Sequence, residues 1–222
     1  MSSSKLHSRR PWWSTLGIYA GLSLAAFIMV VPLLFSFVTA FKSPQDFASH
    51  SPFALPSPPS LASFQAILTG RVNFGDAIIT TLLMVVVMVV GQLVSSVLAA
   101  YAFARIEFPG REVIFWLFLG TMMIPASVLV IPLYLMMAKM GLNNTFWGIV
   151  LPFVFASPYA VFLLRQSFRQ IPQEIIDAAT MDGAGQMRIL FSIVVPVSKP
   201  IISTLVLITV VSQWNSFMWP RI

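Results

Sequence analysis

Three acidic residues lie close together in the stretch "IPQEIIDAATMDGA", residues 171–184. Glu174, Asp177 and Asp182 are three of only seven carboxylates in a chain of 222 residues. Carboxylates can bind a metal, transfer a proton or face a protein partner. The chain has no cysteine, and its two histidines lie far from this stretch. We therefore predict no metal site and no catalytic residue, and we interpret the acids as a contact surface.

The composition shows what kind of protein must position these acids. Hydrophobic residues make up 58% of the chain and charged residues 9%, against about 25% charged residues in soluble proteins. The mean hydropathy is +0.87. The net charge of +6 comes from basic residues that lie between apolar runs. These features predict a membrane protein embedded in a lipid bilayer, without a nucleic-acid partner.

Five apolar stretches are free of charge and long enough to cross a bilayer, which takes about 20 helical residues. Each is expected to be helical, because a segment in hydrocarbon must satisfy its own backbone hydrogen bonds. The first stretch is too long for a signal peptide and predicts a retained anchor. We expect a single all-α, polytopic permease-like domain over residues 1–222, with spans at Pro11 to Phe41, Ala77 to Ala104, Val113 to Ala138, Met140 to Leu164 and Pro200 to Pro220.

The basic residues orient these spans, since lysine and arginine accumulate on the cytoplasmic side of a membrane. With the N-terminus inside, nine basic residues are cytoplasmic and four are external. The segment from Lys42 to Asp76 is then external, and the loop from Arg165 to Lys199 is cytoplasmic. The cytoplasmic set is Lys5, Arg9, Arg10, Arg105, Arg111, Arg165, Arg169, Arg188 and Lys199, and the external set is Lys42, Arg71, Lys139 and Arg221.

The loop at 165–199 contains the acids and predicts folded structure. Pro172 suits the first turn of a helix, and Gly183 suits its end. A helix from Pro172 to Met181 would be about 15 Å long, too short to cross a membrane. A second short helix is expected from Ala184 to Pro196, before the fifth span opens at Pro200. An apolar face is available at Ile175, Ile176, Ala178 and Ala179. Acids on this loop suit a protein partner better than anionic lipid headgroups.

At these residues the chain resembles a known family. "DAATMDGA", followed by Ile193, Pro196 and Pro200, resembles the signature loop of binding-protein-dependent ABC importer permeases. Asp177 stands where the family usually has glutamate. Further stretches resemble the carbohydrate, maltose-permease-like branch, and these are "ARIEFPGR" at 104–111, "GLNNTFWGIVLP" at 141–152 and "WNSFMWP" at 214–220.

The resemblance implies that the short helix is a coupling helix that docks on a separate ATPase. The implied partners are a second permease subunit, two ATPase subunits and an extracytoplasmic solute-binding protein in a bacterial inner membrane. ATP and Mg would bind to the ATPase, and this chain would carry no cofactor. A sixth span is expected beyond the visible end, so either the sequence is truncated, which is the interpretation we favour, or this member is defective. The implied ATPase-coupling residues are Glu174, Asp177, Ala178, Ala179, Asp182, Gly183 and Ala184.

A subunit of a secondary transporter or channel working without ATP is the alternative. The five apolar runs contain no Asp, Glu, Lys, Arg or His, residues that mark proton relays within membranes. Sodium could still bind to backbone carbonyls at broken helices. The chain also lacks a Walker-type phosphate loop, so it is not itself the ATPase.

Polar residues at helical spacing on two spans are candidates for a solute pathway. Amides, hydroxyls and an aromatic ring would suit a sugar, an oligosaccharide or glycerol phosphate. The alternative is that these residues tie helices together, as polar groups commonly do in membranes. The candidates are Gln92, Ser95 and Ser96 on the second span, and Thr209, Ser212, Gln213, Trp214, Asn215 and Ser216 on the fifth.

The predicted topology can be tested directly, because the chain has no native cysteine. A cysteine at Ser49 should react with an impermeant thiol reagent in intact cells, whereas a cysteine at Gln186 should react only after the membrane is opened. Labelling of the Gln186→Cys variant from outside would contradict the topology.

Overall fold

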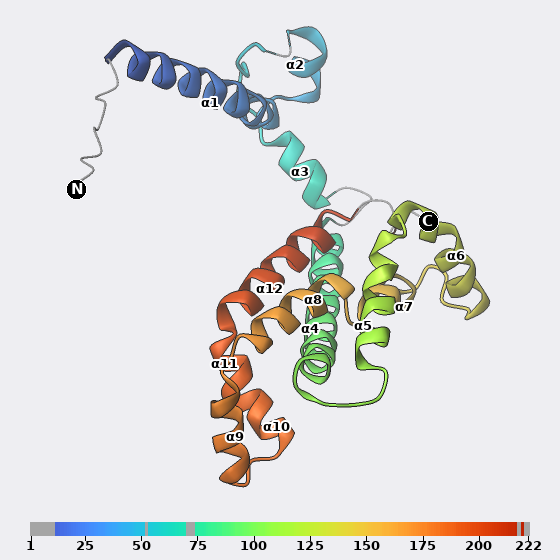
Figure 1. Ribbon diagram of the computed structural model, residues 1–222. Coiled ribbons are helices and arrows are strands. Elements are labelled where there is room, and N and C mark those ends of the chain that lie inside the picture. Colours follow the sequence, from blue (N-terminus) through green and yellow to red (C-terminus); the bar gives the residue numbers. More distant parts are fainter. Residues whose placement is uncertain (1–11, 52, 70–73, 217–218, 220–222) are drawn as a thin grey trace. The chain divides into compact units, whose positions relative to one another are not determined.

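The computed structural model describes residues 12–51, 53–69, 74–216 and 219 (Figure 1). Over this part of the chain every regular element is a helix, and no strand is found. The all-α prediction is therefore confirmed for the described residues. The chain divides into two compact units, residues 1–77 and 78–222. The basic residues before residue 12, together with Arg71 and Arg221, lie outside the described residues.

The first unit contains α1 (Trp12–Ala40), α2 (Pro44–Ser49) and α3 (Ala62–Thr69). The 29-residue α1 is long and apolar enough to cross a membrane and exposes most of its side chains, as expected of a lipid-facing anchor. Ser43 caps α2 by accepting a hydrogen bond from the amide of Asp46 at 3.1 Å. The buried ammonium of Lys42 donates to the carbonyl of Ser51 at 2.9 Å. These hydrogen bonds order the chain between α1 and the proline-rich segment that follows α2.

The second unit is built on α4 (Phe74–Arg105), a 32-residue helix whose first residues belong to the boundary with the first unit. After it come α5 (Arg111–Gly120), η1 (Thr121–Met123), α6 (Ala126–Lys139), α7 (Phe146–Val150), η2 (Leu151–Phe153) and α8 (Pro158–Arg169). The chain continues through α9 (Gln173–Met181), α10 (Gln186–Ile189), the π-helix η3 (Leu190–Val194), α11 (Val195–Val197) and α12 (Lys199–Trp214).

Only α1 and α4 are continuous helices long enough to cross a membrane among the described residues. The third and fourth predicted spans are bent pairs, so the five-helix prediction was too simple. The third is bent by 100° between η1 and α6 and the fourth by 40° between η2 and α8, whereas the predicted fifth span corresponds to α12, with a bend of 80° just before it between α11 and α12. If each bent pair is one span, the described residues hold up to five.

Prolines explain where two of the three bends fall. The residue before a proline avoids the helical region, because the proline ring clashes with its backbone. Ile124, before Pro125, is extended with φ −82° and ψ 119°. Ser157, before Pro158, is likewise extended with φ −85° and ψ 131°. By contrast, Pro132 lies inside α6 without ending it.

The core of the second unit forms where α4, α8, α12 and the short helices after α8 meet. Ala100, Val161, Leu164, Phe168 and Ile189 are buried together there. On α4, Gly91 permits the closest approach. A Cβ atom at this position would lie 2.3 Å from Cγ2 and 2.8 Å from the carbonyl oxygen of Val154. Glycine therefore lets the break in the fourth span pack directly on α4.

Candidate functional site

The short helices between α8 and α12 form a folded projection, here called the knob and defined as residues 170–198. In Figure 1, α9 and α10 lie together beyond one end of α4 and α12. Helix α9 begins at Gln173, with Pro172 as its N-cap, and ends at Met181, within one residue of the predicted bounds. The second helix begins at Gln186 and not at Ala184, and it continues through a π-helical turn to Val197. The sequence thus predicted α9 closely and the second helix only in outline.

The faces of α9 differ from the predicted apolar face. Ile176 is 6% exposed and Ala179 packs against the core, so these two residues face inward. Ile175 is 46% exposed, Ala178 is exposed and Met181 is 87% exposed. The four predicted residues are therefore split between two faces, because a nine-residue helix that rests on the unit can bury only one side. The exposed side offers apolar and acidic groups together.

The predicted coupling acids all lie on the surface of the knob. Glu174, Asp177 and Asp182 are exposed, and the amide of Gln173 donates to Asp177 at 2.9 Å. Gly183 has φ +79°, a left-handed conformation that favours glycine. A Cβ atom there would meet nothing within 4 Å. The last predicted residue, Ala184, is partly buried against the core.

The knob is attached to the rest of the unit by polar contacts from α4. The guanidinium of Arg105 donates to the side chain of Gln173 at 2.6 Å, and the hydroxyl of Tyr101 donates to Gln186 at 2.6 Å. Neither Arg105 nor Tyr101 was predicted as a site residue. The sequence did contain a signal for Arg105, because this arginine ends an apolar run of more than 25 residues. It was used only to predict the orientation of the spans in the membrane.

A cluster of charges holds the neighbouring helix ends together. Glu112, at the start of α5, accepts hydrogen bonds from Arg165 and from Arg169, the latter at 3.1 Å. Arg165 is buried, donates to the carbonyl of Phe103 at 3.1 Å, and lies 3.8 Å from the centroid of the Phe115 ring. A buried arginine is tolerated when its charge is paired and its donors are used in this way. The cluster thereby fixes α8 against α4 and α5.

A polar pocket of about 430 Å³ lies between α4, the start of α8 and α12. It gathers four of the predicted pathway residues from two spans. Gln92 is about 20 Å along α4 from Arg105, and Thr209 is about 15 Å along α12 from Lys199, at 1.5 Å per residue. These distances are about half the thickness of a bilayer core, which is about 30 Å. The polar lining residues are Gln92, Ser157, Tyr159, Thr209, Ser212 and Gln213.

Gln92 has one unusual feature in this pocket. Its Oε1 atom is buried, and no hydrogen-bond donor reaches it among the described residues. A buried acceptor without a partner costs about 1–3 kcal/mol. A ligand hydroxyl that donated to it would recover this cost.

The remaining candidates lie outside the pocket lining. Ser95 donates to the carbonyls of Gly91 and Gln92 on its own helix, at 2.6 and 3.2 Å. Ser96 is buried and accepts a hydrogen bond from the amide of Ser157 at 3.2 Å. On the fifth span, α12 ends at Trp214, and the side chains that follow the pocket residues are exposed. These are Trp214, Asn215 and Ser216.

Two lining residues of the pocket, Ser157 and Tyr159, were missed. Both flank Pro158, where the fourth span breaks. A single helix over this span, as predicted, would not bring these residues beside α4 and α12. Pro158 was the residue in the sequence that could have indicated this break.

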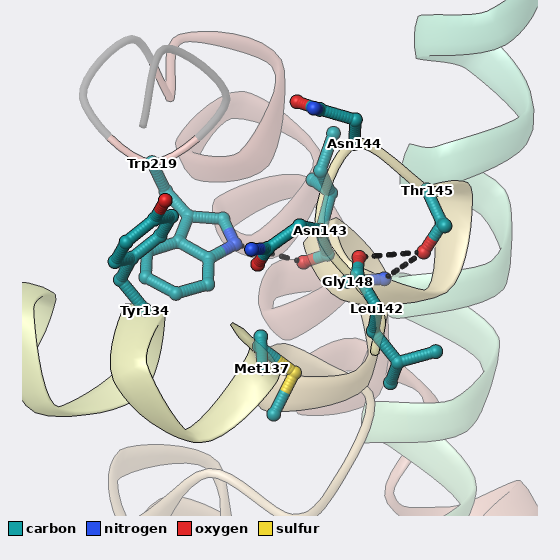
Figure 2. Close-up of a pocket in the computed structure, with 9 residues that line it drawn as sticks. Tyr134, Met137, Leu142, Asn143, Asn144, Thr145, Gly148 and Trp219 are labelled. Atoms are coloured by element: carbon teal, nitrogen blue, oxygen red, sulfur yellow. Dashed lines mark hydrogen bonds between the residues drawn. The ribbon is translucent and has the colours of Figure 1, made fainter. Parts of the chain in front are cut away.

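A second pocket, of about 410 Å³, lies where the connection between α6 and α7 meets the chain after α12 (Figure 2). The indole nitrogen of Trp219 donates to the carbonyl of Ile149 at 3.2 Å. The hydroxyl of Thr145 donates to the carbonyl of Leu142 at 2.7 Å and accepts from the amide of Gly148 at 3.1 Å. Two of the stretches that carry the family resemblance, 141–152 and 214–220, therefore meet at this pocket.

The arrangement of apolar helices around a polar pocket, with a folded knob at one end, is that of a membrane transport protein. The chain belongs to the family of binding-protein-dependent transport system inner membrane components, whose model matches residues 92–222.

Known proteins of similar sequence are permeases. The chain is 32% identical over 203 residues to the diacetylchitobiose uptake system permease protein NgcG of Streptomyces coelicolor, covering 91% of this chain and 67% of that protein. It is 32% identical over 204 residues to the sn-glycerol-3-phosphate transport system permease protein UgpE of Yersinia pestis, covering 90% and 72%. The UgpE protein of Escherichia coli is 31% identical over 216 residues, covering 95% and 76%.

A solved structure shares the fold. One chain in the crystal structure of a bacterial ABC transporter, involved in the import of the acidic polysaccharide alginate, matches with a TM-score of 0.85 and 26% identity. The match covers 97% of this chain and 76% of that chain. The permease fold predicted from the sequence is therefore confirmed, and the family favours the importer over the secondary transporter or channel.

The two glutamines of the pocket allow its role to be tested. If the side chains contact the solute, Gln92→Ala and Gln213→Ala should each lower uptake about tenfold, equivalent to about 1.4 kcal/mol of lost interaction. Assembly of the transport complex should be unchanged. The measurement is uptake per assembled complex in vesicles, with Asn215→Ala, outside the pocket lining, as the matched control.

Normal uptake per complex in both glutamine variants would contradict a pathway role. Loss of assembly without any change in uptake per complex would instead support the helix-packing interpretation.

Proposed function

We propose that this chain forms half of the translocation pathway of an ABC importer for a sugar or oligosaccharide and couples that pathway to a separate ATPase. The observation that carries the proposal is the pairing of a polar pocket between α4, α8 and α12 with an exposed, acidic knob in the same compact unit. Family membership supports the class of machine. The relatives and the solved structure support carbohydrate or related polar solutes.

The lining of the pocket supports a polyhydroxylated solute. Two amides, three hydroxyls from Ser and Thr, and the ring of Tyr159 line it. Amides and hydroxyls can both donate and accept hydrogen bonds, which matches the hydroxyls of a neutral sugar. The aromatic ring offers an apolar face against which a sugar ring can pack. Between a neutral sugar and glycerol phosphate, this lining therefore favours the sugar.

The knob supports docking on a protein surface. Ile175 and Met181 are exposed apolar side chains beside the exposed acids Glu174, Asp177 and Asp182. Apolar anchors surrounded by charged groups are typical of protein interfaces. The open space around Gly183 would let a partner's surface approach the backbone closely.

The proposed partners follow from the family membership. A second permease subunit would complete the pathway, two ATPase subunits would bind the two knobs, and an extracytoplasmic solute-binding protein would deliver the solute. The ATPase would hold ATP and Mg, so no cofactor is assigned to this chain. We place the N-terminus and the knob on the cytoplasmic side of a bacterial inner membrane, on the basic-residue asymmetry.

Gly183 offers the sharpest test of coupling. Gly183→Arg adds a long side chain at the predicted contact and forces a strained backbone angle, so ATPase bound to the permease should fall about tenfold or more. Uptake, and ATP hydrolysis stimulated by the binding protein, should fall with it. The measurements are co-purification of the ATPase and both activities in reconstituted vesicles.

Gly183→Asn is the matched control, because asparagine tolerates the left-handed conformation better than arginine does and adds a small side chain. It should retain most of the ATPase binding. Pairing with the second permease should survive in both variants. Normal ATPase binding and normal stimulated hydrolysis in Gly183→Arg would refute the coupling role.

A further inference from the structure

Arg105, the last residue of α4, holds three separate segments of the chain. Its guanidinium donates to the carbonyl of Phe168 in α8, to the carbonyl of Ile171 in the linker, and to the side chain of Gln173 in α9. These partners lie 63 to 68 positions later in the sequence. The planar guanidinium presents several fixed donors, which a lysine ammonium cannot match. One side chain therefore fixes the end of α8 and the start of α9 on α4.

Tyr101 repeats this contact one helical turn earlier. It is 3% exposed, and its hydroxyl donates to Gln186 at 2.6 Å. Gln173 is the first residue of α9 and Gln186 is the first residue of α10. Both helices of the knob thus begin at a glutamine whose side-chain oxygen is bound by α4.

Apolar packing supports the same attachment. Ile176 of α9 and Ile189 of α10 belong to one buried cluster with Tyr101 and Phe103 of α4. The polar contacts are therefore made at the edge of a packed interface, where they set its register. The knob is therefore joined to the end of α4 by both apolar packing and hydrogen bonds.

Helix α4 connects this contact to the pocket. Helix α4 runs unbroken from Phe74 to Arg105, and Gln92 lines the pocket 13 residues before Arg105, about 20 Å along the helix. Helix α8 also joins the knob to the pocket without a bend, because Tyr159 lies in its first turn and the 40° bend comes before that turn, whereas the path through α12 crosses an 80° bend. Among the described elements, α4 and α8 are therefore the unbent connections between the two sites, and Arg105 holds the end of α8 on α4.

We propose that Arg105, assisted by Tyr101, is the positioning residue that locks the knob to α4, so that displacement of the knob by the ATPase moves Gln92 at the pocket. The inference rests on the proposed function of the knob and the pocket. Arg105 itself touches neither solute nor ATP. It acts through Gln173 and the carbonyls at the start of the knob.

The first test separates docking from transmission. Arg105→Lys keeps the positive charge but loses the fork of donors. We expect ATPase co-purification to persist, while stimulation of hydrolysis by the loaded binding protein and uptake per ATP each fall about fivefold or more. Arg111→Lys is the matched control, because Arg111, at the start of α5, donates to the carbonyl of Ile106 and pairs with its neighbour Glu112 at 3.5 Å, both outside the knob. It should leave both ratios unchanged.

The second test measures whether the knob and α4 move together. Since the chain has no native cysteine, spin labels can be placed at Met187 on α10 of the knob and at Val94 on α4, both exposed. The distance between these labels should stay constant when nucleotide is trapped in the wild-type complex. In the Arg105→Lys variant, the distribution of this distance should broaden or shift when nucleotide is trapped.

Tyr101→Phe removes one hydroxyl without changing the buried ring, and it should give a smaller loss of the same ratios. The inference is overturned if Arg105→Lys and Tyr101→Phe both keep normal stimulation and uptake per ATP. It is also overturned if the labels separate in the wild type as they do in Arg105→Lys, or if Arg105→Lys fails to assemble and Tyr101→Phe is normal. A wild-type complex without stimulated hydrolysis or sugar uptake would instead refute the proposed function.

Discussion

The second unit depends on the requirement that backbone amides and carbonyls in an apolar surrounding find hydrogen-bond partners. Where prolines break the fourth span, the amide of Ser157 loses a helical partner and donates to the buried hydroxyl of Ser96 on α4 at 3.2 Å. Gly91, one turn earlier on α4, leaves the space that Val154 occupies. The pocket exists because this break is both satisfied and tightly packed, which exposes Ser157 and Tyr159 to Gln92 and the polar face of α12.

At the other end of α4, arginine side chains donate hydrogen bonds to backbone carbonyls. The last turns of α8 leave carbonyls without helical partners, and Arg105 binds the one at Phe168. Arg165 uses its donors on the carbonyl of Phe103 and on Glu112. Basic residues that the predicted topology places on the cytoplasmic side thus also bind the carbonyls at helix ends. These contacts attach the knob to α4 at several points, as the proposed coupling requires.

Much of this could be predicted from the sequence, because composition, apolar length and turn residues act locally. The extent of α9 and the left-handed Gly183 followed from Pro172 and the glycine alone. The sizes of the bends at Pro125 and Pro158 could not be predicted, since a proline in a membrane helix produces anything from no bend to a complete break, depending on what packs beside it. The partition of Ile175 and Ile176 between two faces, and the roles of Arg105 and Tyr101, depend on contacts between residues more than 60 positions apart. Such contacts leave no local pattern.

The central claim is that the exposed face of α9 binds the ATPase. It is tested most directly with a photoactivatable phenylalanine at Met181, which is 87% exposed at the end of α9, and at Phe53, which is 80% exposed in the segment predicted to be external. In the assembled complex, we expect a covalent adduct between permease and ATPase from position 181 and none from position 53. Absence of that adduct at position 181, in a complex that still imports its solute, would show that this face of α9 does not bind the ATPase.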